Sequence, residues 1–361
     1  MKSLNNATNC VKIDGAIEIS VWQFLAHTNK PIIIYGMGNG ADKVLALFEK
    51  YGIKCCGVMA SDDFVRGQRY KEFTVHKLDY FEEKYEELII AIAFGTQIDS
   101  VIQHIKMLEK KHTVIVPNVP VFGDEIFDNE FLSINKEKIE SAYNLLSDER
   151  SREVFKNAIK FYYSGKLEYL WSITDDKDEI FYSVLSLKNN ERYIDLGAYR
   201  GDTIDELIHY GGGYEKIIAL EPDRKTYNKL CKHIENMPNI TAYQKTIWKN
   251  NRKLCFSNQK GRGSTISSSG VLVDAVSIDT LSENYNPTYI KIDVEGAEKQ
   301  AIAGGVNTLK NMKPKLNIAA YHTFGDLFEL ILMINAINPE YSFYLRHHPY
   351  IPLWDTNLYC V

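Results

Sequence analysis

The sequence predicts an α/β protein with two sheets of mainly parallel strands joined by a helical segment. Apolar, strand-like runs alternate with amphipathic runs from about residue 30 to 120, and the alternation starts again at residue 191. Between them, apolar residues recur at helical spacing with few glycines or prolines. The length of 361 residues also favours two domains, because one domain has about 150 residues.

The first domain is expected over residues 1–130. The strand PIIIY at 31–35 leads into the glycine turn GMGNGA, a helical stretch and a second strand, IKCCGV, and together these form one βαβ unit. A strand at 87–94, a helical stretch at 97–110 and a strand at 112–117 continue the alternation. This order predicts a small Rossmann-like sheet.

A helical bridge is expected over residues 131–190. Its aromatic run FYYSGKLEYLW leaves two interpretations open, since such residues either pack between helices or line a substrate pocket.

A second α/β domain is expected over residues 191–361. The strand RYIDLG, the turn AYRGD, the helical stretch TIDELIHYG and the strand KIIALEP restart the βαβ pattern. Further strands are expected at NITAYQ, KLCFS, VLVDAVSI, TYIKID and KLNIAA. The ending YSFYLRHH, a Pro-containing turn and NLYCV predict a closing hairpin, which makes the sheet mixed.

Composition excludes several classes of protein. With 45% hydrophobic and 25% charged residues, the chain is neither disordered nor collagen-like. The formal charge of -5, without a basic run, argues against nucleic-acid partners. The six cysteines form no CxxC pair, and no apolar run approaches the roughly 20 residues of a membrane span. A cytoplasmic location without a membrane span is therefore expected.

The strongest motif is Asp195-x-Gly197-x-x-x-Gly201, which follows a strand and precedes a helix. Glycines there allow a tight turn and close approach to a ligand, and Glu221 at the end of the next strand is placed to accept ribose hydroxyl protons. Asp195 is expected to face the crevice, where a carboxylate repels a pyrophosphate and suits the ammonium group of S-adenosyl-L-methionine.

The sequence resembles the FkbM-type family of S-adenosylmethionine-dependent methyltransferases, in a bacterial branch with an N-terminal Rossmann-like domain. The resemblance covers about residues 145–361 and lies in YIDLGAYRGDT, ALEPD, VSIDTL and YIKIDVEGAEKQAIAGG. It implies a seven-stranded Rossmann-like methyltransferase sheet with a reversed last strand, which agrees with the closing hairpin.

The resemblance also implies which residues bind S-adenosyl-L-methionine, grouped by the part of the cofactor that they contact. Those assigned to its methionine part and the adjoining helix start are Asp195, Gly197, Gly201 and Thr203. Those assigned to its ribose and adenine are Glu221, Asp223, Thr246, Ile247 and Trp248, although Trp248 is equally consistent with a core position.

Three acids follow the strand TYIKID at the carboxyl end of the sheet. Asp293 either caps the following helix or, like Glu295, contacts the sulfonium side of the cofactor or the acceptor hydroxyl. In the capping interpretation, Glu298 is expected to be solvated. Because no second ligand cluster is apparent, no metal is predicted.

His322 follows the strand KLNIAA and is the best-placed candidate base, because neutral imidazole is available near pH 7. A hydrogen-bonded structural role is the alternative. The family commonly has a carboxylate before this histidine, whereas Ala320 and Tyr321 stand here. Asp293 and Glu295 complete the candidate catalytic set.

Two other segments keep two interpretations each. Arg346, His347 and His348 bind an acidic acceptor or cap the final hairpin, and the loop STISSSG at 264–270 is a lid or a plain hairpin loop. In the first domain, the turn from Gly36 lacks an acid at the end of the next strand. That domain is therefore either a nucleotide-sugar or acceptor-binding module or a structural, oligomerising one.

These observations predict an O-methyltransferase that methylates a hydroxyl of a sugar or glycan precursor, with S-adenosyl-L-methionine as cofactor. The acceptor is expected to be a small molecule or glycan, with a nucleotide sugar as one option, and homo-oligomerisation is left open. Two alternatives remain: an NAD-dependent oxidoreductase acting through the first domain, and a noncatalytic nucleotide-sugar-binding or assembly protein.

Overall fold

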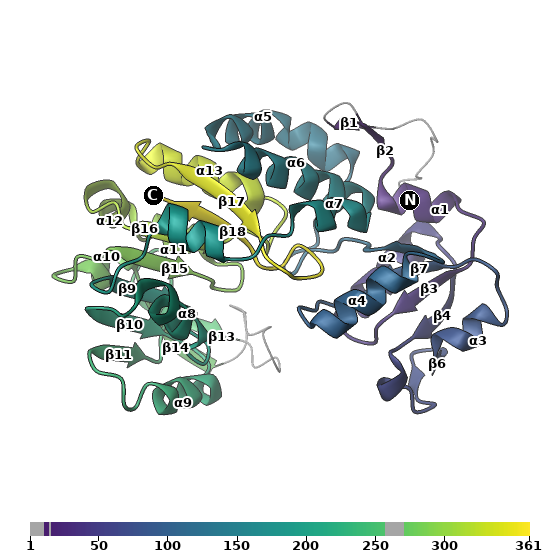
Figure 1. The fold of residues 1–361 in the computed structure, drawn as a ribbon, viewed down its shortest axis with the longest axis horizontal. Coiled ribbons are helices and arrows are strands. Elements are labelled where there is room, and N and C mark those ends of the chain that lie inside the picture. Colours follow the sequence, from purple (N-terminus) through teal and green to yellow (C-terminus); the bar gives the residue numbers. More distant parts are fainter. Residues whose placement is uncertain (1–10, 14–15, 257–270) are drawn as a thin grey trace. The chain divides into compact units, whose positions relative to one another are not determined.

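The computed structural model describes residues 11–13, 16–256 and 271–361 (Figure 1). It divides into two compact units that the chain enters more than once. The first unit comprises 1–137, 153–175 and 347–354, and the second comprises 138–152, 176–346 and 355–361. The domain boundaries at residues 130 and 190 remain predictions.

The first unit contains a six-stranded sheet in the order β5-β6-β4-β3-β7-β8. All neighbouring pairs are parallel except β5 and β6. Its strands are β3 (Ile32–Tyr35), β4 (Cys55–Met59), β5 (Arg69–Tyr70), β6 (Phe73–His76), β7 (Ile89–Ile92) and β8 (Thr113–Ile115). The other elements are β1 (Val11–Ile13), β2 (Ala16–Glu18), α1 (Val21–His27), α2 (Asn39–Tyr51), a 3-10 turn (Asp62–Phe64), α3 (Leu78–Glu82) and α4 (Asp99–Leu108). The predicted parallel α/β domain is present, and β5 and β6 are additions that the sequence pattern did not reveal.

Complete burial explains the uninterrupted apolar runs of this sheet. All four residues of β3 and of β7 are buried, as parallel strands covered on both faces require. Helix α2 packs tightly on the end of β7, because a Cβ on Gly40 would lie 2.3 Å from the carbonyl oxygen of Ala93. The third glycine of the turn, Gly40, therefore serves packing.

The segment predicted to be a helical bridge is helical, with α5 (Asn129–Leu145), α6 (Glu149–Ser164), α7 (Leu167–Ile173) and one π-helical turn (Ile180–Leu185). Its role as a bridge stays a prediction. In its aromatic run, Phe161 and Tyr163 are fully buried within the first unit. This burial supports the packing interpretation. No helix in the described part of the chain is long and apolar enough to cross a membrane.

The second unit contains a seven-stranded sheet in the order β11-β10-β9-β15-β16-β18-β17. Its strands are β9 (Arg192–Leu196), β10 (Lys216–Leu220), β11 (Ile240–Tyr243), β15 (Tyr289–Ile292), β16 (Lys315–Ala319), β17 (Phe343–His347) and β18 (Thr356–Cys360). Strand β18 runs antiparallel to β16, whereas β11, β10, β9, β15 and β16 pair in parallel. This confirms the predicted seven-stranded sheet with a reversed last strand.

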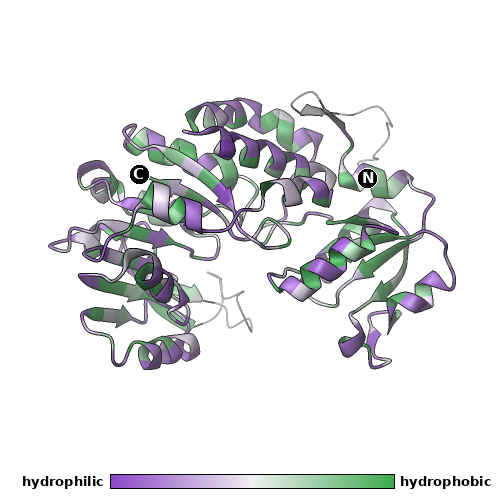
Figure 2. Cartoon of the chain, viewed as in Figure 1, coloured by the Kyte–Doolittle hydropathy of each residue, from purple (hydrophilic) through white to green (hydrophobic). Residues whose placement is uncertain are grey.

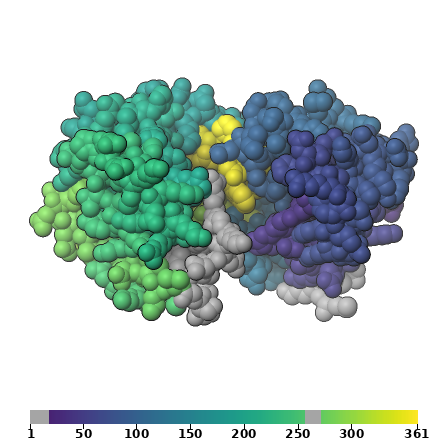
Figure 3. All heavy atoms as spheres, turned by 90° about the horizontal axis from the view of Figure 1, so that it is seen from below, coloured from purple at the N-terminus to yellow at the C-terminus, as the bar shows by residue number. Residues whose placement is uncertain are grey.

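The remaining helices of the second unit are α8 (Asp202–Gly211), α9 (Arg224–His233), α10 (Ile278–Ser282), α11 (Glu298–Ala303), α12 (Val306–Asn311) and α13 (Asp326–Ile337). Figure 2 shows the hydropathy of these elements, and every residue of β15 is buried, including Lys291. On the face drawn in Figure 3, most of the surface of this unit belongs to the teal and green segments of the chain.

Two of the predicted strands lie outside the main sheet. Strands β13 (Arg252–Phe256) and β14 (Val271–Val276) pair with each other, and β14 also pairs with β12 (Thr246–Ile247), which makes a separate three-stranded sheet. The predicted loop at 264–270 lies outside the described residues.

Arg346 on β17 is a buried anchor within the second unit. Its guanidinium lies 2.7 Å from Asp148 Oδ2 and 3.1 Å from Glu179 Oε2, and it also donates to Ser151 Oγ at 2.9 Å. The residue is only 2% exposed. Of the two interpretations of this cluster, the structural one therefore describes Arg346, because its donors are used within the fold.

Candidate functional site

The parallel strands β9, β10, β15 and β16 have their carboxyl ends at one edge of the sheet, and most of the predicted site residues lie at or after these ends. The turn after β9 touches the segment after β15 directly. A Cβ on Gly197 would lie 1.9 Å from the carbonyl oxygen of Asp293, and Gly197 has a φ of +92°. Only glycine suits this position, and its absence of a side chain brings the two motifs together.

Gly201 ends the turn and begins helix α8. It occupies the N-cap position with a φ of +97°, and a Cβ there would lie 2.6 Å from Cδ2 of His233. This glycine therefore serves helix packing as well as the shape of the turn.

The sequence analysis expected Asp195 to face an open crevice. In the structure, Asp195 is instead buried at the end of β9, before the glycine turn. It is fully buried, and Thr203 donates its hydroxyl proton to Oδ2. Its Oδ1 has no hydrogen-bond partner among the described residues. Burial raises the pKa of Asp195 to about 7.

Glu221, directly after β10, is held by backbone donors. Its carboxylate accepts from the backbone N of Tyr199 at 3.1 Å and from that of Asp223 at 2.8 Å. Burial raises the pKa of Glu221 to about 7. Each oxygen keeps a further lone pair, so this oriented carboxylate suits a ligand that presents two hydroxyls.

Asp223 caps helix α9, and its Oδ2 accepts from the backbone N of Thr226 at 2.8 Å. This cap accounts for the acid without a ligand. Thr246 is buried in β12, and Trp248 follows that strand with an indole N–H that has no partner among the described residues. An unused donor there is compatible with the predicted adenine contact.

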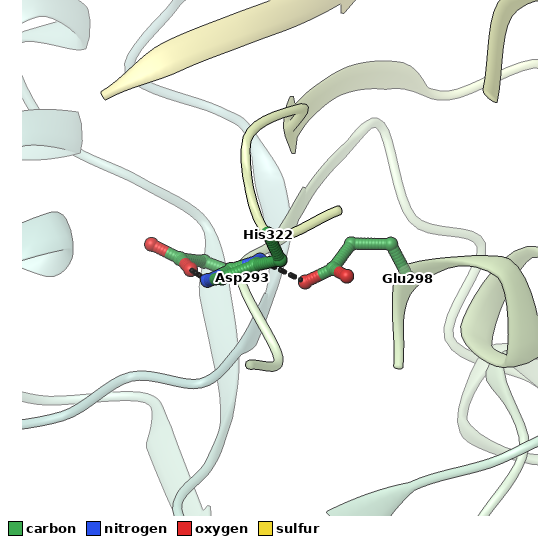
Figure 4. Close-up of side chains that lie close together, drawn as sticks. All are labelled: Asp293, Glu298 and His322. Carbon is green, nitrogen blue, oxygen red and sulfur yellow. Dashed lines mark ion pairs between the residues drawn. The ribbon is translucent and has the colours of Figure 1, made fainter. Parts of the chain in front are cut away.

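The second cluster joins acids after β15 to His322 after β16 (Figure 4). Nε2 of His322 lies 3.7 Å from Asp293 Oδ1 and 3.6 Å from Glu295 Oε2, and Nδ1 lies 2.9 Å from Glu298 Oε1. Glu298 is 1% exposed, so the expectation that it is solvated was wrong. Its Oε1 also accepts from the backbone N of Val294 at 3.0 Å, which ties the loop together.

The carboxylates determine the charge of His322. Burial alone lowers the pKa of a histidine, but Glu298, Asp293 and Glu295 together raise the pKa of His322 to about 10. The ring therefore carries a proton at neutral pH, and the premise of a neutral imidazole does not hold in this arrangement. His322 is 1% exposed, whereas the side chains of Asp293 and Glu295 are 31% and 34% exposed.

Asp293 does not cap the following helix. The N-cap position of α11 belongs to Ala297, and no side chain caps that helix. Instead, Asp293 Oδ2 accepts from Nζ of Lys291 at 3.2 Å, and Oδ1 accepts from the hydroxyl of Tyr321 at 3.4 Å. Burial raises the pKa of Asp293, but Lys291 and His322 outweigh this effect and lower it below its usual range.

By residue type and proximity, Asp293, Glu298 and His322 match a metal-ligand set, since each offers a ligand atom and these atoms lie within 4.8 Å of one another. The imidazole ring, however, lies between the two carboxylates, with one nitrogen toward each (Figure 4). The imidazolium thus supplies the positive charge at the centre of this group. The absence of a metal stays a prediction.

The roles of two site residues, Lys291 and Glu298, escaped the sequence analysis. Lys291 lies within the buried strand YIKI, where a charged residue among apolar ones is itself a signal. Glu298 begins a helix, where an acid is ordinarily exposed, and only the position of His322 reveals its role.

A sheet of this order, with a glycine turn after its first strand and an acid after its second, defines a Rossmann-like methyltransferase fold. Residues 195–345 match the family described as the methyltransferase FkbM domain. This segment of the chain belongs to that family, as the resemblance predicted.

Among the solved structures compared with this chain, one has the same fold over most of its length. A methyltransferase FkbM from Methylobacillus flagellatus KT is 20% identical, with a TM-score of 0.70 over 92% of this chain and 90% of that chain. Fibrillarin from Aeropyrum pernix, solved with natively bound S-adenosyl-L-methionine, is 13% identical, with a TM-score of 0.31 over 48% of this chain and 67% of that chain. Precorrin-6y C5,15-methyltransferase from Geobacter metallireducens GS-15 is 12% identical, with a TM-score of 0.32 over 51% and 85%. A comparison with curated proteins found no match.

Proposed function

We propose that the protein is an S-adenosyl-L-methionine-dependent O-methyltransferase that methylates a hydroxyl of a sugar or glycan precursor. One observation carries this proposal: within an FkbM domain, an oriented carboxylate after β10 and a carboxylate–imidazolium cluster after β15 and β16 belong to one sheet edge. The first suits the donor and the second suits an acceptor hydroxyl.

The residues after β9, β10 and β12 fit the donor. Glu221 would accept protons from the ribose hydroxyls, the unused indole N–H of Trp248 would donate to the adenine, and the turn at Gly197 lets the backbone approach. When bound, the cofactor supplies a methyl group on a sulfonium, ready for in-line displacement.

The cluster of acids would manage the acceptor. Glu295 is partly exposed beside His322, so its carboxylate would orient the acceptor hydroxyl and take its proton as the bond from oxygen to methyl forms. The electron pair of the bond from sulfur to methyl stays on sulfur, which leaves S-adenosylhomocysteine. Asp293, bound to Lys291, would lie toward the donor, and His322 would position both acids.

A sugar acceptor suits these groups, because carboxylates accept hydrogen bonds from several hydroxyls. The first unit would either bind a nucleotide-sugar portion of the acceptor or serve assembly. A cytoplasmic location belongs to the same proposal, homo-oligomerisation stays open, and nucleic acid does not fit the net charge of -5.

Transfer of a labelled methyl group from S-adenosyl-L-methionine to a panel of sugars, glycans and nucleotide sugars tests this proposal. Glu295→Gln should lower turnover by about 100-fold or more, since general acid–base groups contribute that much. The exposed Glu283 gives a matched control, and Glu283→Gln should retain full activity. Transfer to amines and to no hydroxyl, or full activity of Glu295→Gln, would contradict the proposal.

A further inference from the structure

Three polar side chains form a buried row across neighbouring strands at the centre of the second sheet. Asp195 on β9 is in register with Lys291 on β15, and Lys291 is in register with Asn317 on β16. Paired residues of parallel strands point to the same face, so these side chains are neighbours. They are 0%, 8% and 2% exposed.

This row has unused hydrogen-bonding capacity. Oδ1 of Asp195 and Oδ1 of Asn317 are buried and have no hydrogen-bond partner among the described residues. The ammonium group of Lys291 carries three donors, and its only hydrogen bond within the described chain goes to Asp293 Oδ2. Buried polar atoms without partners are rare, and each requires an explanation.

The position of the row connects it to the donor side of the site. Asp195 lies two residues before Gly197, and Lys291 lies two residues before Asp293, so the row is the layer directly beneath the glycine turn. Below it, the rings of Tyr193 and Tyr289 stack at 4.8 Å and close the apolar core. The row is thus a polar floor between that core and the sheet edge.

Within this floor, Lys291 is the member able to meet a ligand. Its side chain keeps 11% exposure and stands 3.2 Å from the 31% exposed Asp293, whereas Asp195 is fully enclosed. A positive and a negative group side by side are complementary to the zwitterionic amino-acid group of the methyl donor, which has one carboxylate and one ammonium.

We propose that Lys291 binds the carboxylate of the donor's amino-acid part. Beside it, Asp293 accepts a hydrogen bond from the ammonium group of the same part of the donor. Asp195 and Asn317 are positioning residues that flank Lys291 in register on the two neighbouring strands. This inference rests on the proposed function, because it requires S-adenosyl-L-methionine as the donor. Lys291 would then set the preference for the complete donor over fragments without the amino-acid part.

Calorimetric titration of the full chain with two probes tests this inference. S-adenosylhomocysteine has the amino-acid part, and 5′-methylthioadenosine lacks it. Lys291→Met should weaken S-adenosylhomocysteine binding by about tenfold or more, as expected for the loss of a charge-assisted hydrogen bond, and leave methylthioadenosine binding unchanged. Lys291→Arg should retain most of the affinity for S-adenosylhomocysteine. Lys253, whose side chain is 71% exposed on β13, gives the control Lys253→Met, which should change neither.

Methylthioadenosine binding also reports whether each variant is folded, and Lys291→Gln provides a second uncharged variant. An equal loss for both probes would overturn the inference, because it would indicate support of the fold. Unchanged S-adenosylhomocysteine binding in Lys291→Met would overturn it as well. If the wild-type chain binds neither probe, the proposed function itself fails together with the inference.

Discussion

The two glycine turns of this chain follow similar strands, yet only the turn in the second unit is accompanied by a buried acid at the end of the next strand. After β9, the turn at Gly197 has a buried carboxylate beneath it and the oriented Glu221 on the next strand. After β3, the turn at Gly36 is followed by a strand that ends at Met59, and the nearest acids, Asp62 and Asp63, are exposed. A glycine turn is therefore a backbone device, and the neighbouring acids decide what it can bind.

The largest expected effect on stability and donor binding comes from replacing a glycine of the turn after β9, with a glycine of the other turn as the control. Gly197→Ala should lower the free energy of unfolding by about 2 to 3 kcal/mol and abolish S-adenosylhomocysteine binding, because its Cβ would meet the carbonyl oxygen of Asp293. Gly38→Ala is the matched control, since a Cβ there meets nothing within 4 Å. Thermal denaturation and calorimetry measure both effects. Equal losses of stability and of S-adenosylhomocysteine binding in the two variants would contradict the distinction between the two turns.

The acids that follow the second strand of each sheet give the next effect. Glu221→Gln should weaken S-adenosylhomocysteine binding by about tenfold or more, because one acceptor becomes a donor. Asp63→Asn changes an exposed acid in the corresponding part of the first unit and should leave that affinity unchanged. Loss of binding in Asp63→Asn would assign the donor to the other turn.

The pH dependence of donor binding also tests whether Glu221 contacts the donor. The pKa of Glu221 is raised to about 7 by burial, so its carboxylate is ionised above that pH and takes up a proton below it. Affinity for S-adenosylhomocysteine should therefore fall by up to about tenfold as the pH drops from 8 to 6. Glu221→Gln should flatten this dependence and leave only the contribution of Asp195, which also titrates near 7. A wild-type affinity that is constant over this range would contradict the assignment.

The smallest effect concerns the helix caps. Asp223 caps α9, whereas Gly38 at the same position of α2 provides no side-chain cap. Asp223→Ala should cost about 1 kcal/mol of unfolding free energy and change S-adenosylhomocysteine affinity by less than about threefold. Urea denaturation with parallel calorimetry measures both. A larger loss of affinity would make Asp223 a ligand-binding residue.

The fold of the second unit could be predicted well from the sequence, because the patterns that indicate its elements are each formed by residues close together in the chain. Apolar strands, the glycine turn and the closing hairpin each depend on residues close together in the chain. Strands β5 and β6 escaped prediction because they are short and only Val75 among their residues is buried, so they have no run of apolar residues.

The site was predicted less completely, because its electrostatics depend on residues far apart in the sequence. The proton on His322 results from acids that follow another strand. The two interpretations of Arg346 could be separated only once its partners Asp148 and Glu179 were known. Glu298 and Lys291 similarly acquire their roles only through tertiary contacts.

The central claim is that the donor binds in the second unit, with Glu221 as a ligand. Calorimetric titration of the full chain with S-adenosylhomocysteine, with NAD as the comparison ligand and Glu221→Ala as the variant, tests it most directly. We predict micromolar binding of S-adenosylhomocysteine that is lost in Glu221→Ala, and no binding of NAD. Saturable NAD binding without any binding of S-adenosylhomocysteine would contradict the account and move the site to the first unit.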